Sequence, residues 1–448
     1  MKKTMRVLGL LAALAAVGAC EGADDRGQSG SGSDGDADGD ADGDADGDAD
    51  GDADSDADGD ADAGSSTLHG TVMAPSVSYP ISGALVYVTL ESVEDINEGT
   101  PIPSEIYCYE CDDMTGKKWT LSNADGSFEL EDVPAGTWRI VTRKGFFRRI
   151  REITVTDTAV TDVPIEVTTL PQANSADGAD TIASYAVALN SWDRPQDMLA
   201  KLGIAELGSD GHIVFGSENF DAYNDDLTEP GYPDSSEIYT SLETMSQYHM
   251  IFMPCTASHL ESSVLDNDDK KMQIREYVAA GGKFYGSCYA YDWIEQPFPA
   301  MIEFPGNDAL TGAATVGSYD TNTTIEDPEM RDWLAVVAPQ ENPDNFHVTG
   351  AWVYAEHTNE VDNGMGLEED NFWVIPKTWV TDIGGGFGSG YPGSPMTITY
   401  NFGCGKIFFS SYQVVESSSS TMIRPQEYVL LYLILEVGVC EGDYIDPE

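Results

Sequence analysis

Short runs of alternating hydrophobic and polar residues fill the chain between residues 67 and 171. Turn dipeptides such as Asp125-Gly126 and Lys144-Gly145 separate these runs. A period of two places successive side chains on opposite faces of a strand, and many short strands divided by turns are typical of antiparallel sheets. Residues 127–130 and 138–141 show this alternation, and residues 85–88, 150–155 and 163–167 are further runs expected to form strands. The pattern predicts an antiparallel β-sandwich.

From residue 173 onward the pattern changes, and apolar strands alternate with helical segments. The expected strands are residues 182–189, 248–254, 283–287, 396–402 and 406–412, the last two as a hairpin. The expected helices are residues 194–202, 237–246, 268–280 and 424–437, with Asp193 as the N-cap of the first, and a short helix up to Trp293. Alternating strands and helices form parallel sheets joined by right-handed crossovers. We therefore predict an α/β domain over residues 173–448.

Residues 1–19 show neither pattern. Lys2, Lys3 and Arg6 precede an apolar run over residues 7–17, and small residues lead from there to Cys20, as in a secretory signal. Residues 16–20 resemble a bacterial lipobox, which implies cleavage after residue 19 and acylation of Cys20. Acyl chains would then hold the protein in a bilayer, and we expect it at the outer membrane, facing the periplasm or the exterior. The alternative is an ordinary signal peptide that leaves Cys20 as a free thiol.

An acidic repeat dominates residues 20–66. Residues 34–62 repeat Asp-Gly-Asp-Ala and contain fifteen Asp. No side chain there is larger than Ala or Asp, so nothing can be buried to offset chain entropy, and we predict a disordered linker. Its Asp-x-Asp-x-Asp-Gly pattern resembles the start of a calcium-binding loop, but Ala stands at the twelfth position, where a bidentate Glu is needed. We expect weak, diffuse Ca²⁺ binding at most, and no resident cofactor or metal.

The negative charge extends beyond the linker. The 448 residues include 78 acidic and 22 basic ones, for a net charge of −56, and residues 172–448 alone contain 44 acidic and 10 basic residues. Such a charge repels a nucleic-acid backbone and excludes it as a partner, whereas it favours cationic ligands. The apolar run over residues 7–19 is too short for a permanent membrane span.

Six basic residues gather in the predicted sandwich. They are Arg139, Arg143, Lys144, Arg148, Arg149 and Arg151. One interpretation is solvated charge on a hairpin. The other is a docking surface for the acidic C-terminal domain or for an acidic glycan.

Two segments of the first folded region carry a family likeness. Residues 122–128, Ser-Asn-Ala-Asp-Gly-Ser-Phe, and residues 133–138, Val-Pro-Ala-Gly-Thr-Trp, resemble a carboxypeptidase regulatory-like domain. This resemblance implies a transthyretin-like or starch-binding-like sandwich over residues 67–171, usually with an accessory role. Some relatives bind carbohydrate, so one hypothesis is that the sandwich is a glycan-binding or adhesion module.

Cys108 and Cys111 form a Cys-x-x-Cys pair in an insertion of the predicted sandwich. The pair is a zinc half-site, a redox pair or a local disulfide. No second Cys or His pair follows nearby, which weakens the zinc interpretation, and an exported protein favours oxidation. We predict a Cys108–Cys111 disulfide.

Residues 277–293 carry a second likeness. Their helix, Gly-Gly, strand and Gly286-Ser287-Cys288-Tyr289-Ala290 turn resemble the nucleophile elbow of class I glutamine amidotransferase-like domains, a group that includes ThuA-like proteins. The resemblance implies a flavodoxin-like α/β domain with Cys288 on a sharp turn. The whole chain also resembles uncharacterised lipoproteins of myxobacterial type that join these two domains, at Phe147-Arg148-Arg149 and Pro425-Gln426-Glu427.

A cysteine nucleophile needs a base. The amidotransferase family supplies it as His-x-Glu after the late strands, and here neither His347 nor His357 is followed by that Glu. Gln413 stands where related sequences tend to have His, and an amide cannot accept a proton at neutral pH. We therefore expect a non-catalytic domain. The alternative hypothesis is a Cys288-dependent hydrolase or amidase of the cell envelope, with His347 or His357 as its base.

Cys255 ends the strand that precedes the elbow strand along the chain. Neighbouring strands lie about 4.8 Å apart, and a disulfide needs Cα atoms about 4.4–6.8 Å apart. A Cys255–Cys288 disulfide is therefore expected, and it would block the nucleophile; an inert buried thiol and a reactive thiolate remain as alternatives for Cys288. Apart from Cys20, six cysteines are present, and Cys404–Cys440 is the expected third bridge.

Further candidate ligand-binding residues follow the expected strands. His259 and Glu261 come after Cys255, Tyr289 and Asp292 come after the elbow, and Gln413 follows the last strand. Open α/β sheets bind ligands at the carboxyl ends of their strands. These residues predict a binding site at that edge, for a glycan or a cationic ligand. The oligomeric state is left open.

Overall fold

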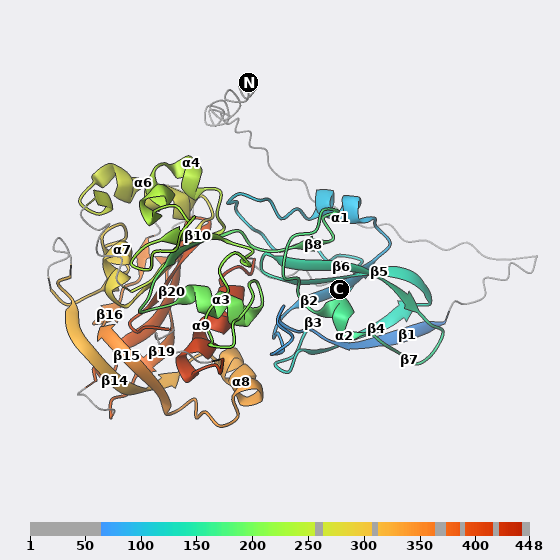
Figure 1. The fold of residues 1–448 in the computed structure, drawn as a ribbon. Helices are drawn as coiled ribbons and strands as arrows, with labels where there is room; N and C mark the ends of the chain where they lie inside the picture. Colours follow the sequence, from blue (N-terminus) through green and yellow to red (C-terminus); the bar gives the residue numbers. More distant parts are fainter. Residues whose placement is uncertain are drawn as a thin grey trace, which may run out of the picture. The chain divides into compact units, whose positions relative to one another are not determined.

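A computed structural model describes residues 64–255, 263–306, 312–362, 373–385, 390–414 and 421–440. The expected signal peptide, Cys20 and nearly all of the acidic linker lie outside the described residues. Contacts group the residues from Asp60 onward into a single unit, which contains several sheets and is rich in β-structure (Figure 1). None of the helices in the described ranges combines the length and the apolar character that crossing a membrane requires.

Two sheets form the N-terminal part of this unit. The first has the strand order β4-β1-β7, and the second has the order β3-β2-β5-β6-β8. Their bounds are β1 Ser65–Thr71, β2 Leu85–Thr89, β3 Lys118–Leu121, β4 Ser127–Pro134, β5 Gly136–Lys144, β6 Phe147–Val155, β7 Val160–Asp162 and β8 Asp180–Thr181. Leu68 and Phe128 from the first sheet share a core with Val86 and Ile140 from the second. The predicted pair of packed sheets is therefore present.

Two details of this part differ from the prediction. Strand β7 pairs with β1 in parallel, because the chain crosses from one sheet to the other after β6 and no tight hairpin sets the direction of β7. The strand expected at residues 163–167 is wrong, since α2 (Ile165–Thr168) begins there. Pro164 precedes this helix at its N-cap position, and proline both lacks the N–H that a strand would need and suits the start of a helix.

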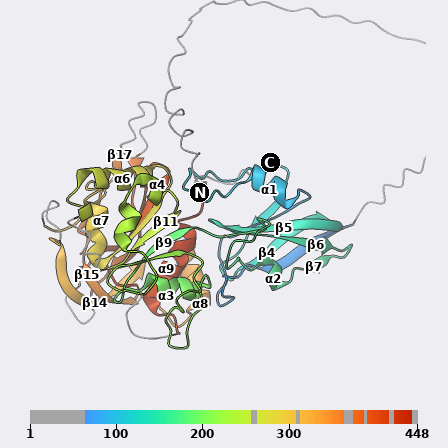
Figure 2. The ribbon, with the colours of Figure 1, turned by 45° about the horizontal axis from the view of Figure 1, so that its top comes forward.

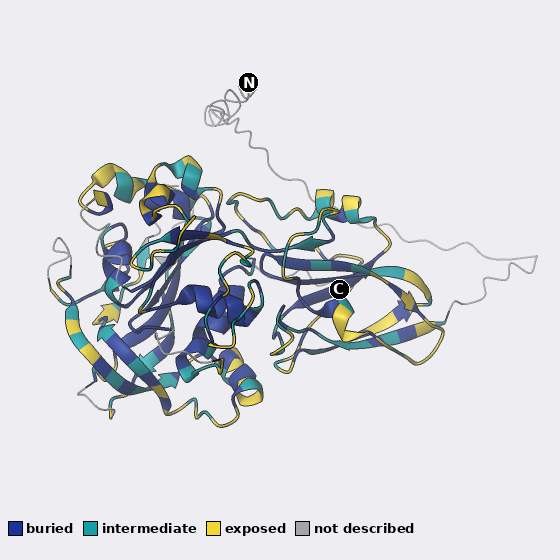
Figure 3. Cartoon of the chain, in the orientation of Figure 1, coloured by how far each residue is buried: buried dark blue, intermediate teal, exposed yellow. Residues whose placement is uncertain are grey.

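The five-stranded sheet is buried on both of its faces. Val86 and Val88 point to the core between the sheets, whereas Leu85 and Tyr87 pack with Ile96 of helix α1 (Val93–Gly99). This explains why residues 85–88 are all apolar instead of alternating. Figure 3 shows the corresponding burial, with exposed residues on the outer side of α1.

A nine-stranded sheet forms the rest of the unit, in the order β10-β9-β11-β12-β21-β20-β19-β14-β15. The pairs from β10 to β21 are parallel, and the pairs from β21 to β15 are antiparallel. The bounds are β9 Tyr185–Leu189, β10 Asp221–Asn224, β11 Met250–Met253, β12 Lys283–Ser287, β14 Thr315–Ile325, β15 Phe346–Val353, β19 Lys377–Asp382, β20 Pro395–Phe402 and β21 Gly405–Ser410. The expected hairpin is β20 and β21. The predicted parallel arrangement holds for only part of the sheet.

Helices cover both faces of the parallel strands. Met250 and Phe252 of β11 pack in the core that includes α3 (Pro195–Leu202), α8 (Pro328–Val337) and α9 (Pro425–Glu436), which lie together in Figure 2. Ile251 and Met253 face the other core. That core includes residues of η1 (Ser235–Tyr239), α4 (Leu242–Met245), α6 (Asp268–Ala279) and α7 (Asp292–Glu295).

The helix expected over residues 237–246 is two separate pieces, η1 and α4. Ser241 lies between them, and its side chain accepts a hydrogen bond from the backbone N–H of Thr244. This N-cap begins a new helix and explains the break.

Two short strand pairs complete the described strands. They are β13 (Ile302–Glu303) with β16 (His357–Thr358), and β17 (Val361–Asp362) with β18 (Trp373–Val374).

The antiparallel strands bring the end of β15 back to the end of β21. Ala351 forms an antiparallel bridge with Tyr412, and the Trp352 N–H donates to the Ser411 carbonyl at 3.2 Å. Register shifts interrupt the pairing of β14 with β15 and of β19 with β20, and such irregularities bend strands. This return places residues 350–354 beside the carboxyl ends of the parallel strands.

Two disulfides join the two parts of the unit. They are Cys108–Cys404 and Cys111–Cys440, with Cα atoms 4.9 and 4.8 Å apart. The expected Cys108–Cys111 and Cys404–Cys440 bridges are therefore wrong. The segment that carries Cys108 and Cys111 forms no helix, and an extended chain separates residues three apart by about 10 Å, beyond the roughly 7 Å that a disulfide can span.

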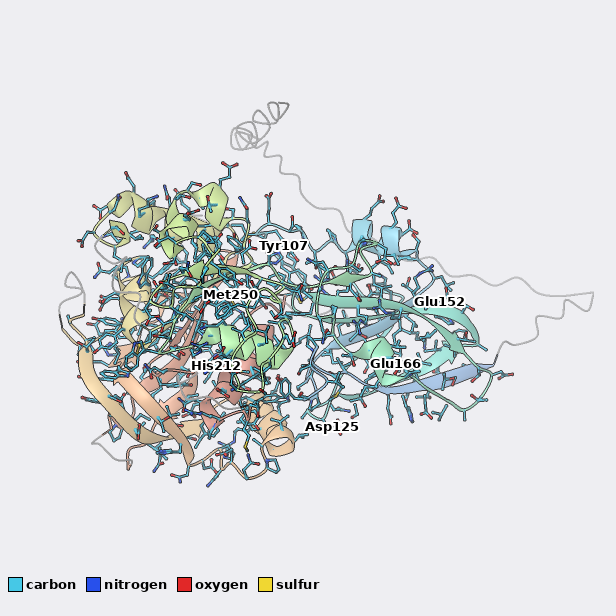
Figure 4. All side chains as sticks on the ribbon, in the orientation of Figure 1. Tyr107, Asp125, Glu152, Glu166, His212 and Met250 are labelled. Atoms are coloured by element: carbon cyan, nitrogen blue, oxygen red, sulfur yellow. A yellow bond between two sulfur atoms is a disulfide. The ribbon has the colours of Figure 1, made fainter. Side chains whose placement is uncertain are left out.

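The insertion of the sandwich packs against the second part at this junction. Tyr107, labelled in Figure 4, belongs to this insertion. Its ring centroid lies 6.0 Å from that of Phe146 and 6.1 Å from that of His249. Gly281 has a φ of +120°, and an added Cβ there would come within 2.2 Å of the Tyr107 carbonyl oxygen. Only glycine permits both that backbone conformation and that approach.

Candidate functional site

The turn after β12 has the geometry of an elbow. Strand β12 ends at Ser287, η2 (Cys288–Tyr291) follows at once, and α7 continues from it. Cys288 has a φ of +53°, in the left-handed region that residues with a Cβ rarely adopt. A Cβ at Gly286 would lie 3.1 Å from the Ala290 carbonyl oxygen, so the small residue is needed for this turn. The sharp strand-to-helix turn expected from the sequence is present.

The sulfur of Cys288 is bonded to that of Cys255. Met253 of β11 is aligned with Gly286 of β12, so the two cysteines, each two residues further on, occupy equivalent places on neighbouring strands. Their Cα atoms are 4.9 Å apart, and both side chains are buried. This is the bridge that the sequence predicts. A sulfur in a disulfide is not a thiolate, so Cys288 cannot act as a nucleophile in this state.

A buried carboxylate that the sequence did not single out for the site stabilises the elbow. The Ser287 hydroxyl donates to Asp193 Oδ2, and the Cys255 N–H donates to the Ser287 oxygen at 3.0 Å. The Val414 N–H donates to the other oxygen of Asp193 at 3.1 Å. Asp193 therefore connects the ends of four strands, β9, β11, β12 and β21.

The N-cap role predicted for Asp193 is wrong. Helix α3 begins at Pro195, and its N-cap position is held by Arg194, which makes no capping hydrogen bond. An Asp just before a helix is the usual sign of a cap. Its position four residues after the end of an apolar strand at Leu189 was the only sequence signal for a role at the carboxyl edge.

Neither candidate base lies with Cys288. His347 is exposed on β15, with Nδ1 3.1 Å from Asn322 Oδ1. It precedes Gly350, which reaches the elbow region, by three residues, or about 10 Å along a strand. His357 is exposed on β16, which pairs with β13. Across the described residues, no contact of either ring with Cys288 is found.

Gln413 lies beside the elbow. Its Nε2 is 4.0 Å from Cys255 Sγ, its N–H donates to the Gly350 carbonyl at 3.1 Å, and its carbonyl accepts from Gln426 Nε2 at 2.6 Å. The side chain is mostly buried. The position at which the sequence analysis expected a histidine in related sequences therefore lies next to the disulfide. In this chain the residue there is Gln413, and its amide cannot act as a base.

The other predicted ligand residues have different surroundings. Asp292 is buried; its Oδ2 accepts from the Gly312 N–H at 2.7 Å, and its Oδ1 has no hydrogen-bond partner among the described residues. Burial raises the pKa of Asp292 to about 6. Tyr289 is partly exposed and packs on Trp352, with ring centroids 5.4 Å apart. His259 and Glu261 lie outside the described residues.

Besides the predicted Tyr289, this edge carries three aromatic side chains that the sequence did not single out. Trp352 and Tyr354 are partly exposed, and Tyr354 stacks on Tyr391 at 3.8 Å with an interplanar angle of 7°. We call Tyr289, Trp352, Tyr354 and Tyr391 the aromatic row. No local pattern shows that these residues meet, because they come from three segments that are distant in the sequence.

The basic residues of the sandwich are largely paired within the protein. Arg143 contacts Asp112 at 2.7 Å, and both Arg149 and Arg151 contact Asp180. Lys144 alone in this group reaches the second part of the unit in the described ion pairs, where it contacts Glu436 of α9 at 2.8 Å. Of the two interpretations, docking on the acidic second part thus describes Lys144. Arg143, Arg149 and Arg151 instead form ion pairs with Asp112 or Asp180, and the side chain of Arg151 is also 35% exposed.

The described part of the chain gathers no cluster of three or more His, Cys, Asp or Glu side chains that could hold a metal ion. The polar groups at the elbow are instead hydrogen-bonded to one another. What this edge offers chemically is a closed disulfide, a buried carboxylate and partly exposed aromatic rings.

No family model and no curated protein matches the chain. Among solved structures it is similar to a cytoplasmic protein from Salmonella typhimurium, with a TM-score of 0.30 and 12% identity over 57% of this chain and 98% of that one. A protein from Bacteroides uniformis provisionally described as ThuA-like has a TM-score of 0.31 and 9% identity, over 56% and 90%. A protein from Pseudomonas aeruginosa provisionally described as carbohydrate binding has a TM-score of 0.19 and 12% identity, over 24% and 89%. Similarities at these TM-scores carry no argument about activity.

Proposed function

We propose that this is an exported lipoprotein whose α/β part binds a ligand or acts as a scaffold without catalysis by Cys288. In this proposal acylated Cys20 holds the chain in the outer membrane, and the acidic repeat is a spacer between the membrane and the folded unit. The α/β part is a variant of a ThuA-like, flavodoxin-like domain, and the sandwich is its accessory. Carbohydrate is the proposed ligand class.

One observation carries the non-catalytic assignment, namely the Cys255–Cys288 disulfide at the elbow. The bridge removes the only cysteine at the position where the resembled family has its nucleophile. Within the described ranges, Gln413 and the distant His347 and His357 provide no histidine base beside it. An oxidising compartment, which the proposed export provides, maintains such a bridge.

The test is the redox state of Cys288 in natively exported protein. Free thiols are alkylated with one reagent, the protein is reduced, and the released thiols are alkylated with a second reagent before peptide mapping. We expect the second label on Cys255 and Cys288, and a peptide pair joined by this bridge in the unreduced digest. First-reagent label on Cys288 in the folded protein would overturn the proposal.

Anchoring needs its own experiment. We expect the wild-type chain in the membrane fraction and a Cys20→Ser variant in the soluble fraction, because the acyl chains are the only proposed membrane contact. Equal membrane association of both proteins would contradict lipidation at Cys20.

A second candidate function is Cys288-dependent hydrolysis after reduction. The φ of +53° at Cys288 favours it, because the strained elbow conformation is kept. It predicts that reductant creates an activity towards amide or ester substrates that is lost in Cys288→Ala. Reduced protein without such activity would leave the binding function as the only one of the two.

A further inference from the structure

We propose that the aromatic row is a stacking platform for the sugar rings of a neutral polysaccharide. This inference rests on the proposed ligand-binding function and specifies its site and ligand. It places binding at the carboxyl edge of the nine-stranded sheet, next to the closed elbow, and not on the sandwich.

The row is formed by strand geometry. Trp352 and Tyr354 are partly exposed, whereas Val353 and Ala355 between and after them are buried in the core. This period of two puts the two rings on the same side of the chain, about 7 Å apart at their Cα atoms. Tyr289 extends the row from the elbow at one end.

Tyr391 supports the other end of the row from behind Tyr354, and the structure holds it in place. Its ring stacks on one face of Tyr354, and it packs against buried Tyr319 in a T-shaped contact with centroids 5.3 Å apart. The Tyr391 N–H donates to buried Asp382 at 2.7 Å. Rings that are ordered before binding lose little conformational entropy when a ligand stacks on them.

The three tyrosines of the row keep their hydroxyls available, whereas Nε1 of Trp352 is buried and has no partner among the described residues. Among the described residues, the hydroxyls of Tyr289, Tyr354 and Tyr391 make no hydrogen bond to another protein group. A pyranose ring presents C–H groups on its faces and hydroxyls around its rim. A partly exposed ring that ends in a free hydroxyl matches both features.

The charge of the molecule selects the kind of sugar. Residues 172–448 contain 44 acidic and only 10 basic residues, so a sulfated or uronic-acid polymer would be repelled. A small organic cation would instead need rings arranged around it as a cage. Tyr354 and Tyr391 are stacked on each other, with centroids 3.8 Å apart and planes at 7°, and therefore leave no space between them for a cation.

The experiment is affinity electrophoresis of the full chain in detergent, through gels containing dextran, mannan or a soluble β-1,3-glucan, with dextran sulfate as the acidic counterpart. We expect at least one neutral polymer to retard the wild-type protein and dextran sulfate not to. Trp352→Ala and Tyr354→Ala should weaken that binding by about tenfold or more, and Tyr354→Phe should weaken it less because the ring remains.

The matched control is Trp138→Ala. Trp138 is a partly exposed ring on the sandwich, and its Nε1 donates to the Pro134 carbonyl at 2.8 Å. We expect this variant to bind as the wild type does. Loss of binding in Trp138→Ala but not in Trp352→Ala would move the site to the sandwich and overturn the inference.

Two further outcomes would also overturn it: no retardation by any neutral polymer, or stronger retardation by dextran sulfate. Melting temperatures of all variants show that a loss of binding is not a loss of folding, and Tyr354→Phe covers the case in which an Ala variant does not fold.

Failure of the stacking platform can be distinguished from failure of the proposed function. A free Cys288 thiol together with intact glycan binding would overturn only the non-catalytic assignment that rests on the Cys255–Cys288 disulfide. A bridged Cys288 without glycan binding would overturn only the proposed stacking platform.

Discussion

His249 is a buried residue whose protonation the fold opposes. Its ring stacks on Phe146 of the sandwich at 4.3 Å, its Nδ1 accepts from the Ser184 N–H at 3.0 Å, and its Nε2 donates to the Pro103 carbonyl at 2.7 Å. The two hydrogen bonds require the neutral ring with its proton on Nε2. Burial, and secondarily the charge of Lys283, lower the pKa of His249 to about 4.

The lowered pKa of His249 predicts that the free energy of unfolding falls in mild acid. The unfolded chain takes up the proton near pH 6.5, whereas the folded chain resists it down to about pH 4. The contribution of His249, of the order of 3 kcal/mol, is therefore fully present above about pH 6.5 and is lost as the pH falls to about 4. The free energy of unfolding in urea, measured at pH 7.5 and at pH 4.5, tests this loss.

A His249→Asn variant isolates this effect from the titration of the many carboxylates. We expect it to be less stable than the wild type at pH 7.5 and to approach it at pH 4.5. His357→Asn, at an exposed histidine, is the control and should follow the wild type at both pH values. A constant difference between His249→Asn and the wild type would contradict the role of His249.

At the scale of elements, a buried ion pair joins α3 to α9. Lys201 Nζ lies 2.8 Å from both carboxylate oxygens of Glu427, and the two side chains are 4% and 1% exposed. Glu427 also accepts from the Arg424 N–H at 2.9 Å, which caps the start of α9. The pair therefore sets both the contact between the helices and the first turn of α9.

We expect Lys201→Met to destabilise the protein by roughly 3–5 kcal/mol, because it leaves the Glu427 carboxylate buried without its partner. The double variant Lys201→Met/Glu427→Leu should recover much of this loss, since it removes both charges. Urea unfolding of the two variants provides the measurement. Lys271→Met breaks an exposed pair with Asp268 and should cost less than about 1 kcal/mol; a similar cost for Lys201→Met would contradict the argument.

At the scale of the whole molecule, the sandwich is bound to the second part by covalent and packing contacts. The bridges Cys108–Cys404 and Cys111–Cys440 span 296 and 329 residues along the chain. Core residues of β2, β4 and β5 belong to the same cluster as those of α9. An isolated fragment of residues 67–171 would therefore expose apolar surface and lose both bridges, which weakens the hypothesis of an independent glycan-binding module.

We expect the double variant Cys111→Ser/Cys440→Ser to lose about 2–5 kcal/mol. Because Cys108–Cys404 remains, the second bridge closes only the further loop through residues 108–111 and 404–440, about 40 residues in the unfolded chain. Thermal melting with and without reductant measures the effect. Cys255→Ser/Cys288→Ser is the comparison, since that bridge spans 33 residues, and loop-closure entropy predicts a loss of similar size. Clearly unequal losses would show that strain or packing, and not loop length, decides the contribution.

The features that the sequence by itself determined are local in the chain. The change from two-residue alternation to alternating strands and helices predicts a sandwich followed by an α/β part, and Gly286 with the residues that follow predicts the elbow. The expected boundary near residue 172 stays a prediction, and β8 (Asp180–Thr181), which lies beyond it, pairs with β6 of the sandwich. The Cys255–Cys288 bridge also follows from sequence, because consecutive parallel strands of equal register place their ends side by side.

Only the tertiary structure decided the contacts between distant segments. Cys108 meets Cys404 because the insertion docks on the second part of the unit, and Asp193 meets Ser287 because two strand ends converge. Trp352 reaches Tyr289 because irregular pairing bends the antiparallel strands back to β21. Local patterns record propensity and burial, whereas these meetings depend on the docking and bending of whole elements, to which many weak contacts contribute together.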